Sequence, residues 1–253
     1  MNPVYFVGAG PGDPELITVK GARLLKEADV VVYAGSLIPP EVLRYIRPEV
    51  TVYNSAELNR KEIARILIEA ARAGKKVVRL SSGDPSLYGA VIELMALLDE
   101  AGVPYEVVPG VSSFLAAAAR LKKEYTLPGV SQTLILTRLA GRTPVPETEG
   151  LAALARHGAS LCLFLSVQQV EEAAAALAAG YPPDTPVAVV QKVTWPEERV
   201  IRCRLQDLVT EVKKTAIEKT ALILVGEFLT GQGEPSRLYD PEFSHGHRPG
   251  GNG

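Results

Sequence analysis

Two glycine-rich segments carry the residue types best suited to bind a small ligand close to the backbone. Residues 8–18 read GAGPGDPELIT and follow a short apolar run. Glycine lets a ligand approach the main chain closely, and a helix that starts after such a loop can bind a phosphate. The triplet GDP at 12–14 recurs at 83–85 within SSGDPSLYG, and a third small-residue loop, PGVSS, occupies 109–113. Because the carboxyl ends of parallel strands share one sheet edge, we expect the three loops to form one ligand pocket.

The first loop departs from the dinucleotide fingerprint G-x-G-x-x-G. Gly8 and Gly10 fit the pattern, but Gly12 comes one residue early. Pro11 lacks the backbone N–H that a phosphate would need. The second apolar run ends in YAGSL, without a ribose-binding acid, and no Gly-Lys-Ser/Thr follows the loop. The residues therefore disfavour an NAD-dependent oxidoreductase, which is kept as the alternative from another class.

The Asp and Pro that follow each glycine also have a plain structural interpretation. Asp is a good helix N-cap and Pro suits the first helical turn, which accounts for Asp13 more completely than for Asp84. Tyr88 follows Asp84 in what we expect to be the first turn of a helix, so its hydroxyl could face a substrate. Asp84 and Tyr88 are therefore the candidate catalytic residues, and no residue is named as a general base.

Hydrophobic periodicity places these loops on an α/β framework. In the first half, short apolar runs predict strands at 4–7, 30–33, 51–53, 77–80 and 105–108. Amphipathic stretches between them predict helices at 14–27, 41–47, 60–73 and 86–101, the last two closed by Gly74 and Gly102. Strands that alternate with helices predict a parallel sheet covered on both faces.

The second half has a different pattern. Strand-like runs lie at 133–137, 160–165, 187–190, 200–204 and 222–225, and helical ones at 149–156, 167–179 and 205–215. The run EERVIRCRL alternates polar and apolar residues, which is typical of a half-exposed antiparallel strand, so we expect a mixed sheet. We therefore predict an N-terminal parallel-sheet α/β domain over 1–124 and a mixed-sheet α/β domain over 125–230. The segment 231–253, rich in Gly, Pro, Ser and His, is predicted to be a disordered tail.

Composition narrows the possible functions. With a formal net charge of -2, the chain has no overall cationic field, so we expect no nucleic-acid partner. No apolar run approaches about 18 residues and no basic leader opens the chain, which predicts no membrane partner and a cytoplasmic location. Cys162 and Cys203 lie in strand-like runs and are expected to be reduced and buried. His157 ends a predicted helix, and His245 and His247 lie in the tail, so we expect no metal site.

Several longer segments resemble one family. VGAGPGDPELITVKGARLL, ADVVVYAGSL, SSGDPSLYG and VPGVSS are similar to segments of the tetrapyrrole methyltransferases, which use S-adenosylmethionine to methylate carbon atoms of cobalamin and sirohaem precursors. LTRLAGRTPVPE and KVTWPEERVIR resemble one branch, the precorrin-4 or cobalt-precorrin-4 C-11 methyltransferases of cobalamin biosynthesis. The resemblance extends to about residue 229. It implies S-adenosylmethionine as cofactor, a corrin precursor as substrate, a homodimer, and a ligand cleft between two α/β domains.

The resemblance also implies which residues bind the methyl donor. They come from the loops of the first half and from strand ends of the second: Pro11, Ser82, Gly83, Asp84, Leu87, Ser112, Ser113, Leu165, Val193, Thr194, Ala221 and Leu222. The carboxylates of a corrin precursor need cationic partners, and Arg138 and Arg142 in the loop TRLAGRTPVPE are the candidates, with Tyr88 as a third substrate contact. Trp195 could form a flat wall of the site or simply stabilise a strand end.

Three alternatives stay open within or near this family. The uroporphyrinogen methyltransferases carry an acid after the second strand, where this chain reads Ala34, Gly35 and Ser36, which argues against that substrate. A methyltransferase of the same fold could act on another precorrin, on ribosomal RNA or on a translation factor. A non-catalytic S-adenosylmethionine-binding protein is the third, because methyl transfer by positioning requires no nucleophile. These residues do not distinguish a cobalt-containing from a metal-free substrate.

Overall fold

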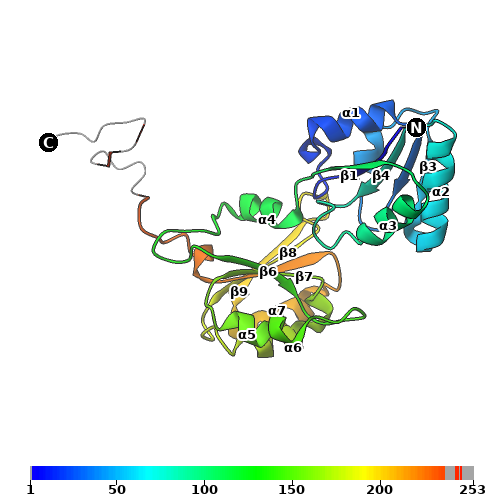
Figure 1. Ribbon diagram of the computed structural model, residues 1–253. Coiled ribbons are helices and arrows are strands. Elements are labelled where there is room, and N and C mark those ends of the chain that lie inside the picture. Colours follow the sequence, from blue (N-terminus) through cyan, green and yellow to red (C-terminus); the bar gives the residue numbers. More distant parts are fainter. Residues whose placement is uncertain (1, 237–242, 245, 247–253) are drawn as a thin grey trace. The chain divides into compact units, whose positions relative to one another are not determined.

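The computed structural model describes residues 2–236, 243, 244 and 246, and the chain forms two compact units (Figure 1). The first comprises the residues up to Ala117 together with Lys192–Glu198. The second comprises Ala118–Gln191 together with the described residues from Arg199 onward. The division after residue 124 stays a prediction about independently folding domains. Most of the predicted tail, with His245 and His247, lies outside the described residues.

A five-stranded parallel sheet forms the first unit, which confirms the predicted fold of this half. Its strand order is β3-β2-β4-β1-β5, with every pairing parallel. Helices α2 (Arg60–Arg72) and α3 (Ile92–Glu100) cover one face of the sheet, and α1 (Val19–Glu27) covers the other. The strands are β1 (Val4–Gly8), β2 (Val30–Tyr33), β3 (Thr51–Asn54), β4 (Val77–Ser81) and β5 (Tyr105–Val108).

Two of the predicted helices begin later than expected. Pro14–Leu16 is a separate 3-10 turn, and α1 starts only after Thr18, whose hydroxyl accepts a backbone hydrogen bond (3.1 Å). The helix expected from residue 86 is α3, which begins at Ile92. Tyr88 and Ala90 precede it with φ of 54° and 49°, a left-handed backbone that ends any right-handed helix. The prediction that Tyr88 lies in a helical turn is therefore wrong.

Local signals were more reliable for the helix predicted at 60–73. This is α2, which starts with a capping box in which Asn59 and Glu62 accept hydrogen bonds from each other's backbone N–H groups. Gly74 follows it with φ of +78°, a conformation that favours glycine. By contrast, the helix expected at 41–47 is a 3-10 helix over Pro40–Tyr45.

The second unit contains the mixed sheet that was predicted. Its strand order is β6-β7-β10-β8-β9, and among the described strands β6 and β7 pair in parallel while the other pairings are antiparallel. Helices α5, α6 and α7 pack on one face of it. The strands are β6 (Leu134–Arg138), β7 (Ser160–Phe164), β8 (Pro186–Gln191), β9 (Arg199–Arg204) and β10 (Ala221–Val225), and the helices are α5 (Leu151–Ala155), α6 (Val170–Leu177) and α7 (Leu208–Thr215). The division between the two units falls within α4 (Ser113–Leu121).

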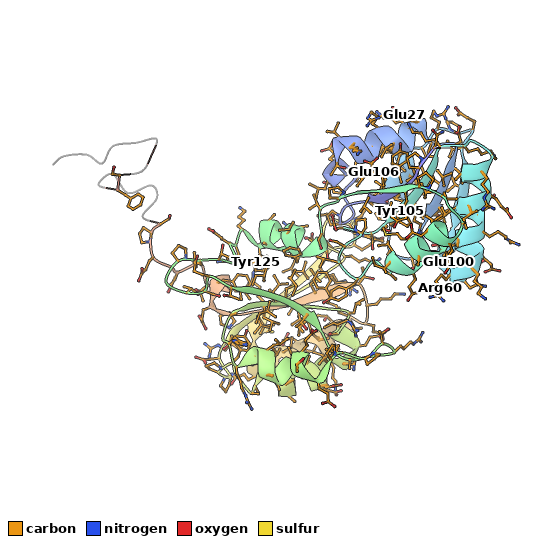
Figure 2. The ribbon with its side chains drawn as sticks, viewed as in Figure 1. Glu27, Arg60, Glu100, Tyr105, Glu106 and Tyr125 are labelled. Carbon is orange, nitrogen blue, oxygen red and sulfur yellow. The ribbon has the colours of Figure 1, made fainter. Side chains whose placement is uncertain are left out.

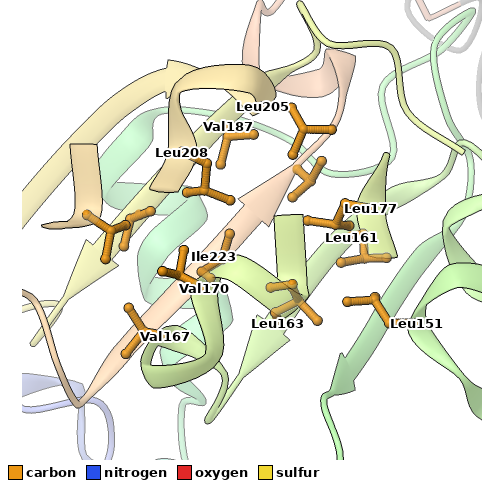
Figure 3. Close-up of a cluster of buried hydrophobic side chains, with 14 of the residues drawn as sticks. Leu151, Leu161, Leu163, Val167, Val170, Leu177, Val187, Leu205, Leu208 and Ile223 are labelled. Carbon is orange, nitrogen blue, oxygen red and sulfur yellow. The ribbon is translucent and has the colours of Figure 1, made fainter. Parts of the chain in front are cut away.

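The core of the second unit lies between this sheet and its helices (Figure 3). Leu161 and Leu163 of β7 and Ile223 of β10 are fully buried there, together with Leu177 of α6 and Leu208 of α7. Each buried leucine or isoleucine contributes about 1.5–3 kcal/mol relative to an exposed one. This core holds the strand ends that carry the second-unit candidates in place.

Ion pairs of the first unit lie on its outer surface (Figure 2). Glu27 pairs with Lys76, Arg60 with Glu93, and Glu106 with Lys20. Exposed pairs of this kind contribute about 0–1 kcal/mol each, so apolar packing rather than surface charge holds the sheet and its helices together. In the part of the chain that the structure describes, no helix has the length and apolar character needed to cross a membrane.

Candidate functional site

Three glycines bring the loops after β1, β4 and β5 into direct backbone contact. A Cβ placed on Gly8 would lie 2.6 Å from the Cα of Gly110 and 2.7 Å from the carbonyl oxygen of Gly83. A Cβ on Gly110 would lie 2.2 Å from the same Gly83 oxygen. No side chain fits at such distances, so packing requires glycine at 8 and 110, whereas Gly83 is favoured by its φ of +59°. The gathering of these loops at one sheet edge, expected from the parallel sheet, is confirmed.

Hydrogen bonds tie these loops together and engage several of their backbone N–H groups. Gly83 N–H donates to the Gly10 carbonyl (2.8 Å), and Gly10 N–H donates to the Gly83 carbonyl (3.2 Å). The N–H of Gly110 donates to Asp84 Oδ2 (2.8 Å), and that of Ala9 donates to a β4 carbonyl (2.7 Å). The prolines at 11, 14, 85 and 109 have no N–H at all. A pyrophosphate needs several converging free N–H groups, and the engaged N–H groups together with the prolines reduce the number that this edge can offer.

Asp84 is a clamp between two loops and does not cap a helix. Its Oδ1 accepts hydrogen bonds from the backbone N–H (2.8 Å) and the hydroxyl of Ser86, while Oδ2 accepts from Gly110. Partial burial raises the pKa of this carboxyl, but the hydrogen bonds from Ser86 and Gly110 outweigh it, so the pKa lies below its ordinary value. A carboxylate that is ionised and engaged at both oxygens is poorly suited to accept a proton as a general base.

A segment from far along the chain completes the first unit. Lys192–Glu198, which we call the strap, follows β8 and packs on the GPGD loop at 10–13. Thr194 Oγ1 accepts a hydrogen bond from the N–H of Asp13 (2.8 Å), and Trp195 Nε1 donates to the carbonyl of Pro11 (2.9 Å). Together they border a hollow of about 310 Å³, lined by Gly12, Asp13, Pro14, Glu41, Arg44, Thr194, Trp195 and Pro196. Trp195 therefore forms a wall beside the glycine loop.

The remaining first-unit candidates lie on the same loops. Ser82 and Leu87 are half-buried, Ser112 is buried and Ser113 opens α4. Tyr88 is exposed at 44% and strained at φ 54°. Ala90, Lys192 and Thr194 also have positive φ in these loops and the strap (49°, 46° and 69°). Strained residues of this kind persist where the surroundings fix them, and they concentrate at functional sites.

Five predicted site residues belong to the second unit. Leu165 follows β7, 69% exposed and with φ of 52°, whereas Ala221 and Leu222 are buried in β10. Arg138 donates hydrogen bonds to the carbonyls of Leu139, Thr143 and Pro144 at 2.9–3.0 Å, so it holds its own loop closed. Arg142 lies exposed in that loop. The structure brings the first-unit candidates together, and the roles of these five residues stay predictions.

Arg79 is a buried charged residue that the sequence did not single out. It is buried at 9% exposure in β4 and donates to the carbonyls of Val32 (3.2 Å) and Leu80 (3.3 Å). Among the described residues its Nε has no partner, and neither has the hydroxyl of Ser81 two positions on. Burial lowers the pKa of Arg79 to about 10. The sequence did carry a signal for Arg79, because in VVRLS a charged residue interrupts a buried strand near the edge that bears the three loops.

Thiols and imidazoles offer no further chemistry in the described part of the chain. No three His, Cys, Asp or Glu residues gather there so as to hold a metal ion. Both cysteines are free, and Cys162 is buried as predicted, but Cys203 is only half-buried because it lies on the edge strand β9. Burial raises the pKa of Cys162 and raises that of Cys203 to about 11, so both stay protonated and unreactive at neutral pH.

The comparison with known proteins places this loop architecture in a family. A family model described as Tetrapyrrole (Corrin/Porphyrin) Methylases matches residues 3–209. The chain belongs to this family. It is 49% identical to the cobalt-precorrin-4 C(11)-methyltransferase of Methanocaldococcus jannaschii, over 97% of this chain and 95% of that protein. It is also 49% identical to the precorrin-4 C(11)-methyltransferase of Pseudomonas aeruginosa, over 98% of this chain and 99% of that protein.

Solved structures of the family share the fold. A cobalt precorrin-4 methyltransferase, a cobalamin biosynthetic enzyme, matches with a TM-score of 0.87 at 46% identity, over 90% of this chain and 95% of that one. A uroporphyrin-III C-methyl transferase from Thermus thermophilus, complexed with S-adenyl homocysteine, matches with a TM-score of 0.76 at 35% identity. That match covers 91% of this chain and all of the other (100%). Both the resemblance and the fold expected from the sequence are confirmed.

Proposed function

We propose that the protein transfers a methyl group from S-adenosylmethionine to C-11 of precorrin-4 or cobalt-precorrin-4 in cobalamin biosynthesis. Relatives named for this reaction match almost the whole chain at 49% identity. The structural observation that carries the proposal is the contact of Gly8, Gly83 and Gly110. It builds a closely packed backbone floor, in which the N–H groups of Ala9, Gly10, Gly83 and Gly110 are engaged, at the sheet edge where α/β proteins bind ligands.

This floor fits S-adenosylmethionine better than a phosphorylated cofactor. The cofactor supplies an electrophilic methyl group on a cationic sulfonium. The loops offer small side chains, backbone and the ionised Asp84, and the N–H groups that bond within the loops are not available to a pyrophosphate. We assign donor binding in the first unit to Pro11, Ser82, Gly83, Asp84, Leu87, Ser112, Ser113, Val193 and Thr194, and in the second to Leu165, Ala221 and Leu222.

The chain's own residues act by positioning. Methyl transfer between two bound molecules gains most of its rate when donor and acceptor are held about 3–3.5 Å apart in line, with water excluded. The three rigid loops suit this role, because their backbones are fixed by mutual contact and by the Asp84 clamp. Asp84 is ionised at neutral pH and orients the loops through its hydrogen bonds. Tyr88, exposed beside them, is the substrate-facing side chain of the first unit.

The substrate proposal assigns one recognition role to the second unit. A corrin precursor carries several carboxylates, and Arg142 is exposed to meet one of them, in a loop that Arg138 holds closed. A homodimer, a cytoplasmic location and the absence of nucleic-acid and membrane partners complete the proposal. Any difference between the cobalt-containing and the metal-free substrate lies in the macrocycle, because the metal is part of the substrate.

Calorimetric titration tests the donor site and a methylation assay tests the reaction. We expect S-adenosylhomocysteine to bind and NAD to give no heat of binding under the same conditions. The assay then supplies S-adenosylmethionine with precorrin-4 in one arm and cobalt-precorrin-4 in the other, and detects the methylated product by mass spectrometry. Binding without product in either arm would support a non-catalytic donor-binding protein, and binding of NAD alone would restore the oxidoreductase.

A further inference from the structure

The strap is held in a conformation that its own sequence does not favour. Lys192 and Thr194 have φ of 46° and 69°, although neither is glycine. Within the strap, the backbone N–H of Trp195 donates to the Lys192 carbonyl (2.9 Å), and the backbone N–H of Thr194 donates to Glu198 Oε2 (2.8 Å). Two left-handed residues in three positions cost free energy, so contacts outside the strap must maintain this shape.

Those contacts are made to the glycine loop, more than 180 residues earlier in the chain. Trp195 Nε1 donates to the Pro11 carbonyl across 184 positions, and the Asp13 N–H donates to Thr194 Oγ1 across 181. Between them, Gly12 lies against the indole so closely that a Cβ there would be 2.2 Å from Trp195 Cδ1. The loop is therefore held from the strap side by two hydrogen bonds and a close ring contact.

The same loop is held from its other side by the floor of the donor site. Gly10, one residue before Pro11, exchanges two backbone hydrogen bonds with Gly83. A shift of the Pro11 carbonyl would therefore be transmitted through a single residue to the Gly10–Gly83 bridge. Because Gly83 also touches Gly8 and Gly110, the strap and the three loops form one mechanically continuous set of backbone contacts.

We propose that Trp195 is a positioning residue for methyl transfer, which acts by fixing the Pro11 carbonyl and through it the floor against which the donor lies. This rests on the proposed function. The residue works through the loop and does not need to touch the donor. A loop displaced by about 1 Å can cost about 100-fold in rate even when binding is preserved. Loss of the indole N–H should therefore lower kcat more than it changes KM.

The test compares two conservative variants that each lose one aromatic donor to a backbone carbonyl. Trp195→Phe keeps a ring over Gly12 and loses the bond to Pro11. Tyr181→Phe loses the bond from the Tyr181 hydroxyl to the Ala159 carbonyl (2.6 Å) in the core of the second unit, outside the strap and the proposed site. We expect Trp195→Phe to lower kcat at least tenfold with KM within threefold. Tyr181→Phe should keep the wild-type kcat, and we expect both variants to melt a few degrees lower.

The protein offers a direct optical readout of the strap, because Trp195 is the single tryptophan of the chain. Saturation with S-adenosylhomocysteine should change its emission, with a midpoint equal to the calorimetric Kd. Unchanged emission at saturation would overturn the proposal, as would a wild-type kcat in Trp195→Phe or an equal loss in both variants. If the wild-type protein binds the donor but methylates neither substrate, the proposed function fails first, and the positioning role falls with it.

Discussion

Replacing Gly110 by alanine should open the floor of the donor site. The added Cβ would lie 2.2 Å from the Gly83 carbonyl oxygen and 2.8 Å from the Gly8 Cα. Both are backbone atoms, so no flexible side chain can move aside. Overpacking usually costs about 1–3 kcal/mol, and a clash with backbone on two sides belongs at the upper end, about 3 kcal/mol. For a chain of this size, that predicts a melting temperature lower by roughly 6–12 °C.

The matched control is the same substitution where space exists. A Cβ on Gly150 would meet nothing closer than 3.5 Å, and its φ of -58° is open to any residue. Gly150→Ala should therefore stay within about 1 kcal/mol of the wild-type free energy of unfolding. Thermal unfolding followed by circular dichroism gives the stability of both variants, and calorimetry with S-adenosylhomocysteine gives the affinity of each.

We expect Gly110→Ala to bind S-adenosylhomocysteine at least tenfold more weakly, and Gly150→Ala to bind it like the wild type. A tenfold loss corresponds to about 1.4 kcal/mol, which is less than half of the strain that the clash predicts. If Gly110→Ala matched Gly150→Ala in both melting temperature and affinity, the three-glycine contact would not be the floor of the donor site, and the argument from it would be refuted.

Substitutions at three further residues test other parts of the structure. Asp84→Ala should lower the free energy of unfolding by about 1–2 kcal/mol at pH 7. Because the pKa of Asp84 in the folded protein lies below the ordinary 3.8, this difference should persist down to about pH 4 and vanish at lower pH. A stability difference that grows on acidification would contradict the role of Asp84 as a clamp. Arg138→Met and Arg138→Lys should both speed proteolytic cleavage within 139–146, because neither side chain can bond to three carbonyls at once. Cleavage of the Lys variant at the wild-type rate would mean that a positive charge alone is enough to hold the loop closed. Arg79→Met should leave the free energy of unfolding at pH 7 unchanged to within about 1 kcal/mol or raise it, because among the described residues the buried guanidinium has no carboxylate partner and bonds only to the carbonyls of Val32 and Leu80. Urea unfolding that shows a loss above about 3 kcal/mol would contradict this.

Much of the fold followed from local patterns that act over a few residues. Alternating apolar runs and amphipathic stretches predicted both sheets, and Gly74 marked the C-terminal end of α2. The helix predicted from residue 86 failed because positive φ at Tyr88 and Ala90 is imposed by the surrounding loops, and neither residue type indicates it. For the same reason Asp84, a sound cap by type, became a clamp.

The candidate site divides in the same way between local and long-range causes. The glycines and prolines of the three loops already disfavoured a phosphate, because proline has no N–H whatever the fold, and the parallel order of the strands already brought the loops to one edge. Only the tertiary structure decided that Gly8 and Gly110 must be glycine, that Asp84 bridges two loops, and that Trp195 reaches Pro11. These contacts join residues that lie up to 184 positions apart in the chain, and no local sequence pattern encodes how closely such residues approach in space.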